Sequence, residues 1–129
     1  MSDIRRVSAP EASALLAEGY QYVDVRTQAE YAAGHPAGAH NVPFMLAGNP
    51  GMKPNPEFLA SMESRFPKDT KLVVGCQAGG RSIKACQALR DAGYTDLVDM
   101  RPGYGGARNS FGQVTEPGWA AAGLPTETS

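Results

Sequence analysis

Long apolar runs are missing from this chain of 129 residues. No stretch approaches the roughly 20 consecutive apolar residues that a transmembrane helix needs, so we expect no membrane span. The first six residues, MSDIRR, also lack the apolar core of a secretory signal. The chain as given is therefore expected to be cytoplasmic, although an upstream targeting segment that had been removed would leave no trace in it.

Excess charge of either sign is missing too. The 12 basic and 13 acidic side chains give a net charge of -1. This balance provides no basic stripe for nucleic acid and no polybasic patch for a membrane, so we expect neither as a partner. There is no internal repeat or low-complexity tract. The length and the 42% hydrophobic content indicate one globular domain over residues 1–129, with a core from about residue 4 to residue 125.

Cysteine is scarce, since the sequence holds only Cys76 and Cys86, and these do not form a C-x-x-C pair. Their spacing argues against a structural zinc site, and we expect neither a metal nor a cofactor. Cys86 lies at helical spacing between Ile83 and Leu89, so we interpret it as a core residue on an apolar helix face. A disulfide to Cys76 would require that helix to bend or unwind. A reducing compartment suits a reactive free thiol.

Cys76 opens a glycine-rich turn, CQAGGRS, at residues 76–82. The segment before it, KLVVG, has the composition of a buried strand, and residues 82–90 show helical spacing. Cys76 is thus expected at the carboxyl end of a strand, where loop amides and the first N–H groups of the next helix are unpaired. Because such donors favour negative charge, the turn is expected to stabilise a thiolate and to hold an anionic substrate.

The spacing from Cys76 to Arg81 is one residue shorter than the C-x(5)-R loop of cysteine phosphatases. A tighter ring of amides suits one additional sulfur atom on the thiol better than a tetrahedral phosphate. The spacing therefore favours sulfur transfer, and a cysteine phosphatase or arsenate reductase is the less favoured alternative. In the simplest interpretation, Cys76 is a small buried hydrophobic residue beside an ordinary turn.

Two segments resemble the rhodanese family. VVGCQAGGRSIKACQALRDAGY, residues 73–94, is similar to the family's C-x-x-G-x-R-S loop with the helix and A-G-Y that follow it. YVDVRTQAEYAAGHPAGAHNVPF, residues 22–44, resembles the second hallmark, which reads D-V-R, then E-Y, then G-H-I-P-G-A-x-N-I-P. With a weaker match in the tail, the resemblance covers Ile4 to about Pro125. Residues 108–118 depart from the family pattern as an insertion, which could be a lid, an oligomer contact or a neutral loop.

The resemblance implies a thiosulfate sulfurtransferase that uses Cys76 as the nucleophile. Sulfane sulfur would pass from thiosulfate or a similar anionic donor to cyanide or a thiol acceptor through a Cys76 persulfide. Positive φ angles at the two glycines would let loop N–H groups surround the terminal sulfur, and Arg81 would bind sulfonate oxygens or pin the loop. The expected binding residues are Gln77, Ala78, Gly79, Gly80, Arg81 and Ser82. The alternative is a persulfide carrier that depends on a protein sulfur donor or acceptor.

Four further residues are expected to support the site structurally. Asp24 and Arg26 lie in a strand predicted at residues 20–26, and with Glu30 they are interpreted as an internal ion-pair network rather than an acid-base set. His35 matches the family's G-H position, where hydrogen bonding to a turn is its expected role. Its spacing from His40 suits no zinc site.

Predicted strands and helices alternate along the chain, which implies an α/β fold of the rhodanese-like type. We expect a mainly parallel central sheet of about five strands with helices on both faces. The expected strands are residues 4–7, 20–26, 40–42, 71–75 and 96–100.

The expected helices are residues 9–18 and 27–32, one that follows residues 55–57, and the helix after Cys76 at residues 82–90. The third helix should turn Phe58, Leu59, Met62 and Phe66 inward. Residues 45–54, rich in glycine and proline, are predicted to be a surface loop. Trp119 is expected to pack a terminal helix onto the sheet.

Overall fold

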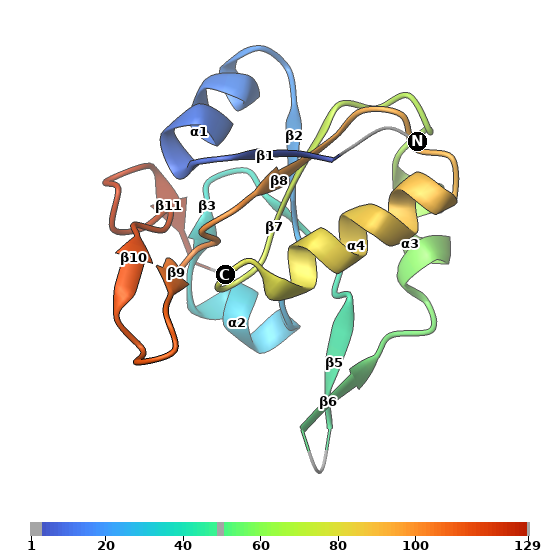
Figure 1. Ribbon diagram of the computed structural model, residues 1–129. Coiled ribbons are helices and arrows are strands. Elements are labelled where there is room, and N and C mark those ends of the chain that lie inside the picture. The colour runs from blue at the N-terminus through green and yellow to red at the C-terminus, as the bar shows by residue number, and fades with distance from the viewer. Residues whose placement is uncertain (1–3, 49–50, 129) are drawn as a thin grey trace.

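The computed structural model describes residues 4–48 and 51–128 and has a parallel sheet at its centre (Figure 1). The strand order is β1-β8-β7-β2-β4, and every pairing between these neighbours is parallel. The sheet consists of β1 (Arg5–Val7), β2 (Gln21–Asp24), β4 (His40–Asn41), β7 (Leu72–Gly75) and β8 (Leu97–Met100). The predicted five-stranded parallel sheet is confirmed, although each strand is shorter than its expected range.

In the described residues, four helices connect and cover these strands, and two of them begin with a capping box. They are α1 (Ala9–Ala17), α2 (Gln28–Ala33), α3 (Phe58–Arg65) and α4 (Gly80–Asp91). Before α1, Ser8 and Glu11 satisfy each other's backbone N–H groups, and Thr27 and Glu30 do the same before α2. α1 ends ahead of Gly19, whose φ of 103° is one that other residues rarely adopt.

The sheet is buried on both faces, because successive residues of a strand point to opposite sides. Val74 belongs to a cluster with Met62 of α3 and Leu89 of α4. Its neighbour Val73 belongs to a second cluster with Leu15 of α1. Helices α3 and α4 therefore cover one face and α1 the other, as Figure 1 shows, and the predicted arrangement is confirmed.

The prediction of a surface loop at residues 45–54 is wrong. The segment forms an antiparallel hairpin of β5 (Met45–Gly48) and β6 (Gly51–Pro54), which projects from the body of the molecule in Figure 1. Its strands are almost fully exposed, so no apolar periodicity marks them in the sequence. Gly51, one of the glycines that suggested a loop, begins β6 with a φ of 69°.

The terminal helix expected around Trp119 is also absent from the described chain, where residues 119–123 form turns. Gly123 has a φ of 77° within this segment, and Pro125 follows it closely. Trp119 is nonetheless buried. Its backbone N–H donates to Gly103 O at 3.0 Å, and its indole Nε1 donates to Pro125 O at 2.7 Å. The tryptophan packs as expected, but turns hold it in place.

The inserted residues form a second hairpin, β9 (Ala107–Arg108) with β10 (Val114–Glu116). Arg101, directly after β8, donates to both carboxylate oxygens of Glu116 at 2.8 and 2.7 Å. This ion pair ties the insertion to the end of β8. A further short pairing joins β3 (His35–Pro36) to β11 (Thr126–Glu127).

Helix α3 differs from the prediction at one position. Phe58 and Met62 are buried and Phe66 follows the helix into the core, but Leu59 is 38% exposed. The next residue along a helix points about 100° away from its predecessor, so Leu59 lies beside the buried face. No helix in the part of the chain described is long and apolar enough to cross a membrane.

Candidate active site

Cys76 follows β7 directly, at the edge of the sheet where the carboxyl ends of the parallel strands meet. Its side chain is 2% exposed. The Gly79 N–H donates to Cys76 Sγ at 3.1 Å, and the Cys76 thiol lies 3.5 Å from Ser82 Oγ, to which it donates. The sulfur is therefore held within the turn between β7 and α4, as predicted from the loop sequence.

Of the two loop glycines expected at positive φ, only Gly79 adopts such an angle. Its φ is 99°, and a Cβ at this position would collide with the carbonyl oxygen of Arg101. The expectation for Gly80 is wrong, because this residue is already the first of α4 and has no positive φ. The left-handed Gly79 lets its amide point at the sulfur, and helix α4 begins two residues earlier than expected.

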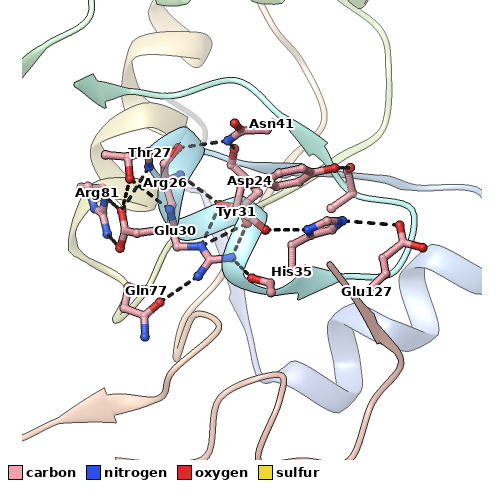
Figure 2. A network of polar contacts seen from close by, with 12 residues as sticks. Asp24, Arg26, Thr27, Glu30, Tyr31, His35, Asn41, Gln77, Arg81 and Glu127 are labelled. Carbon is pink, nitrogen blue, oxygen red and sulfur yellow. Dashed lines mark hydrogen bonds and ion pairs between the residues drawn. The ribbon is translucent and has the colours of Figure 1, made fainter. Parts of the chain in front are cut away.

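Arg81 forms an ion pair with Glu30 (Figure 2). Its Nη1 lies 2.7 Å from Glu30 Oε1, and its Nη2 lies 3.0 Å from Oε2. Hydrogen bonding by Arg81, assisted by Thr27, lowers the pKa of Glu30 to about 2. Of the two roles predicted for Arg81, this geometry corresponds to pinning the loop.

Asp24 and Arg26 form a separate buried ion pair, so the expected three-residue network with Glu30 divides into two pairs. Arg26 Nη2 lies 2.7 Å from Asp24 Oδ2 and also donates to Gly34 O. Its Nη1 donates to Gln77 Oε1 at 3.0 Å, and its guanidinium lies 4.5 Å from the centre of the Tyr104 ring. Arg26 therefore links the end of β2 to the side chain of the residue after Cys76.

His35 packs against α2 rather than lining the Cys76 pocket. Its ring stacks on Tyr31 at 3.6 Å, and Nδ1 lies 2.7 Å from Tyr31 O. Because a carbonyl only accepts, Nδ1 carries the hydrogen in this contact. Nε2 lies 3.5 Å from Glu127 Oε1 of β11, so the side chain joins α2 to the C-terminal strand (Figure 2). Within the described ranges, no group of three or more histidine, cysteine or acidic side chains could hold a metal.

The segment after β8 contributes backbone contacts that sequence reasoning missed. Tyr104 N–H donates to Cys76 O at 2.7 Å, and Gly105 N–H donates to Gln77 O at 2.9 Å. Gly103 packs so closely that a Cβ there would lie 2.5 Å from Cys76 O. The glycines at 103, 105 and 106 were the available signal, because close backbone approach is a common reason for glycine after a strand.

A buried acid behind the loop was also missed. Asp99 of β8 is fully buried, and its Oδ2 accepts from Arg6 Nε of β1 at 2.7 Å. Burial raises the pKa of Asp99, outweighing the opposing effects of the Ser82 hydroxyl and Arg6. The two residues lie 93 positions apart in sequence, and no motif connects them.

A pocket of about 320 Å³ opens above Cys76. Six of its lining residues come from the segment 76–84, and two more precede or begin β5. The lining residues are Phe44, Met45, Cys76, Gln77, Ala78, Gly80, Arg81 and Lys84. Gly79 and Ser82, predicted as binding residues, contact the sulfur without lining this pocket. The arrangement offers a thiol at the base of a partly apolar pocket with two cations among its lining residues.

Comparison with known proteins places this geometry in a family. A family model described as a rhodanese-like domain matches residues 8–109. The chain belongs to the rhodanese-like domain family. The match ends just after the start of the insertion, which agrees with the departure noted in the sequence, and the resemblance seen in the two hallmark segments is confirmed.

Relatives of this rhodanese-like protein include the Arabidopsis thaliana protein named thiosulfate sulfurtransferase 16, chloroplastic. The two are 44% identical over 121 residues, which are 94% of this chain and 91% of the relative. The mitochondrial protein HIGH ARSENIC CONTENT 1 of A. thaliana is 38% identical over 81% of this chain, which spans 62% of that relative. The chain spans about half, 47%, of the senescence-associated protein DIN1 of Raphanus sativus.

Solved structures share the fold along the whole chain. The crystal structure of Rv0390 from M. tuberculosis superimposes with a TM-score of 0.83 at 27% identity, covering 99% of this chain and all of that one. The rhodanese-like domain of the Anabaena protein Alr3790 superimposes with a TM-score of 0.70 at 21% identity, over all of this chain and 81% of that one. The latter similarity concerns the fold alone.

Proposed function

We propose that this rhodanese-like protein is a sulfurtransferase that carries sulfane sulfur as a persulfide on Cys76. The observation that carries the proposal is the Cys76 sulfur, which accepts the Gly79 N–H at 3.1 Å at the base of an open pocket. Donors of this kind stabilise a thiolate and the negative charge of a bound sulfur. Two relatives with names that include thiosulfate sulfurtransferase, at 44% and 39% identity, support the same activity.

The reaction has two halves. In the first, the Cys76 thiolate attacks the outer sulfur of thiosulfate, the S–S bond of the donor breaks, and sulfite leaves with the electron pair. Cys76 then carries a persulfide. In the second half, cyanide or the thiolate of an acceptor attacks the outer sulfur, and the Cys76 thiolate is regenerated. This is covalent catalysis in ping-pong order, carried by the thiol itself.

The loop supplies the positioning for both halves. Gly79 and Ser82 contact the sulfur from the side of α4, and the Tyr104 N–H holds the Cys76 carbonyl. Arg81 lines the pocket, and its ion pair with Glu30 fixes the position of the loop. Preorganised donors of this kind need no rearrangement when negative charge develops.

The test is the intact mass of the reduced protein after incubation with thiosulfate, and again after cyanide is added. We expect a gain of one sulfur atom, its loss to cyanide, and formation of thiocyanate. Cys76→Ser should show no gain while its circular dichroism stays native. Cys86→Ala is the matched control, because Cys86 is fully buried and burial raises the pKa of its thiol. Sulfur uptake by Cys76→Ser would overturn the assignment.

The same assay separates the alternatives. A protein that gains no sulfur from thiosulfate but accepts it from a protein persulfide would be a carrier. The arsenic-related name of one relative justifies an arsenate assay with a thiol reductant on the same preparation. The Cys76 to Arg81 spacing is one residue shorter than the C-x(5)-R loop that cysteine phosphatases use for phosphate, so we expect the reduction of arsenate, a phosphate analogue, to stay at background.

A further inference from the structure

The two cations that line the Cys76 pocket are in different electrostatic states. Arg81 is held by both oxygens of Glu30, at 2.7 and 3.0 Å. Its Nη1 also lies 3.6 Å from Met52 Sδ of the projecting hairpin. Lys84 is exposed. Among the described residues it forms no ion pair, because no acidic oxygen lies within 4.0 Å of its ammonium group. Lys84 is therefore the pocket cation that can bind an anionic ligand without first breaking an ion pair.

The pocket also has three apolar lining residues, Phe44, Met45 and Ala78, which we call its apolar wall. The Phe44 ring is fixed edge to face against the buried Phe58 at 5.1 Å. At about 320 Å³ the space lies in the range of pockets that hold organic ligands. Thiosulfate, a small dianion, would leave most of this wall uncovered and would have to compete with Glu30 for the second cation.

Resting on the proposed sulfur transfer, we propose that the pocket selects organic sulfur donors with an apolar body and a single negative charge over inorganic thiosulfate. The apolar body lies on Phe44 and Met45, and Lys84 receives the anionic group. Glu30 is a positioning residue for this selectivity, because it keeps Arg81 from serving as the second cation that a dianion needs.

A thiosulfonate, R–SO₂–S⁻, is the simplest donor of this class. The Cys76 thiolate attacks its outer sulfur, the bond between the two sulfur atoms breaks, and the sulfinate RSO₂⁻ leaves with the electron pair. One monoanion enters and one monoanion leaves, and the persulfide keeps the charge of the original thiolate. With thiosulfate the leaving group is the dianion sulfite, which a single free lysine neutralises less completely.

Three donors separate the two parts of this inference, with cyanide as the acceptor. Methanethiosulfonate resembles thiosulfate in size but carries one charge. Benzenethiosulfonate has the same reacting group as methanethiosulfonate but a larger apolar body. We expect kcat/KM for benzenethiosulfonate to exceed that for methanethiosulfonate by about tenfold or more, since one buried ring is worth more than a single methyl group. An equal kcat/KM for these two donors would overturn the apolar part of the inference.

Variants of the wall and of the charges complete the test. Met45→Ala should lower the ratio between the benzene and methane donors by about threefold to tenfold. Leu46→Ala, a neighbour on β5 that does not line the pocket and is 39% exposed, is the matched control and should leave the ratio unchanged. The same loss of ratio in both variants would contradict a specific role of the wall.

Lys84→Gln should lower kcat/KM by about fivefold for the two thiosulfonates and by more for thiosulfate. Its control is Lys71→Gln, which changes an exposed lysine just before β7 and so at the far end of that strand from Cys76.

Glu30→Gln should raise kcat/KM for thiosulfate relative to that for methanethiosulfonate, because it weakens the ion pair that holds Arg81. An unchanged ratio in a folded Glu30→Gln protein would overturn the charge part of the inference. If Glu30→Gln does not fold, the ratio of thiosulfate to methanethiosulfonate in Lys84→Gln decides instead: it should fall, because the dianion depends more on the one free cation.

Failure of the inference is distinguishable from failure of the proposed function. Persulfide formation on Cys76 with any of the donors, measured by intact mass, supports sulfur transfer whatever the order of preference. If thiosulfate forms the persulfide with kcat/KM equal to or above that of both thiosulfonates, the selectivity is wrong and the transfer activity stands. If no donor forms it, both proposals are overturned.

Discussion

Arg81 and Glu30 form a two-point ion pair that joins the Cys76 loop to α2, with N to O distances of 2.7 and 3.0 Å. The same carboxylate accepts from the Thr27 N–H at 3.1 Å and so closes the capping box of α2. One side chain therefore stabilises the start of a helix and fixes the loop that holds the thiol. The pair is partly exposed, with side-chain exposures of 18% and 28%, so solvent weakens it to some extent.

The first prediction concerns the acid stability of this pair. The pKa of Glu30 is lowered from 4.5 to about 2, first by hydrogen bonding from Arg81. Because the pKa of Glu30 is lower in the folded than in the unfolded protein, its carboxylate stabilises the fold when the pH is above the unfolded pKa. That contribution is lost as the pH falls from 4.5 toward 2. After allowance for solvent, Glu30→Gln should lower the free energy of unfolding by about 1 to 2 kcal/mol at pH 7.

Urea unfolding of Glu30→Gln and wild type between pH 7 and pH 2 measures this contribution. The gap between the two proteins should close as the pH falls below 4.5. Glu57→Gln, which changes an exposed glutamate ahead of α3, serves as the control and should follow wild type throughout. A gap that stays constant with pH would mean that the Glu30 carboxylate charge does not stabilise the protein.

The second prediction compares the two loop glycines. Gly79 has a φ of 99°, and a Cβ there would collide with Arg101 O, whereas a Cβ at Gly80 would meet nothing within 4 Å. We expect Gly79→Ala to lower the free energy of unfolding by more than about 2 kcal/mol and to abolish sulfur transfer. Gly80→Ala lies at the first position of α4 and should change stability by less than about 1 kcal/mol.

Thermal unfolding and thiocyanate formation measure both effects. The comparison is informative because the two variants add the same methyl group to adjacent residues. If Gly79→Ala were as stable and active as Gly80→Ala, the left-handed conformation at residue 79 would not be required for the loop.

The third prediction concerns the buried Asp99. Removing Arg6 leaves this carboxylate without its ion-pair partner, which for buried pairs costs about 3 to 5 kcal/mol. The Arg6 side chain is 42% exposed, so water replaces part of it, and we expect a loss of about 2 to 3 kcal/mol in Arg6→Ala at pH 7. Arg5→Ala, which removes the exposed neighbouring arginine of β1, is the control and should cost less than about 1 kcal/mol.

The deficit of Arg6→Ala should also shrink on acidification, but at a higher pH than the deficit of Glu30→Gln. Burial raises the pKa of Asp99. Because the pKa of Asp99 is higher in the folded than in the unfolded protein, its contribution to stability is fully present when the pH is below the unfolded pKa. That contribution is lost as the pH rises through the folded pKa. The deficit of Arg6→Ala should therefore shrink as the pH falls from 7 toward 5, because protonation removes the unpaired charge. Urea midpoints at these pH values measure it, and a deficit that grows on acidification would contradict the mechanism.

The strands of the sheet and the position of Cys76 were predictable from the sequence because their signals are local. Residues 72–74 are a short β-branched and apolar run, and the glycine-rich turn follows without interruption. The capping box at Ser8 needs only four consecutive residues. In each case the residues that determine the structure lie within one turn or one strand of each other.

The contacts that complete the site were not predictable, because they join distant parts of the chain. Arg81 was assigned a sulfonate or a pinning role, and only the fold brings Glu30, 51 residues away, against its guanidinium. Tyr104 meets Cys76 through backbone atoms, which leave no trace in residue type. The hairpin at residues 45–54 was missed for a related reason, since its strands are exposed and bury no apolar face.

The last prediction tests whether the C-terminal turns support the loop. Trp119 donates to Pro125 O, packs edge to face on Tyr22 at 5.7 Å, and donates its N–H to Gly103 O. Gly103 in turn packs directly against Cys76 O. We expect Trp119→Ala to lower the free energy of unfolding by about 3 to 5 kcal/mol. Trp119→Phe should lower it by about 1 to 2 kcal/mol, because the ring remains and the indole hydrogen bond is lost.

Activity distinguishes support of the loop from general stability. Phe111, at the tip of the inserted hairpin, is 86% exposed, so Phe111→Ala should leave both stability and sulfur transfer near wild type. Circular dichroism in urea measures unfolding, because removal of Trp119 also removes the only tryptophan fluorescence. Under conditions where Trp119→Phe is fully folded, its kcat for sulfur transfer should still fall, since the Gly103 turn that holds the Cys76 carbonyl is less firmly anchored. If a measurably destabilised Trp119→Phe kept the wild-type kcat, Trp119 would stabilise the core without supporting the Cys76 loop.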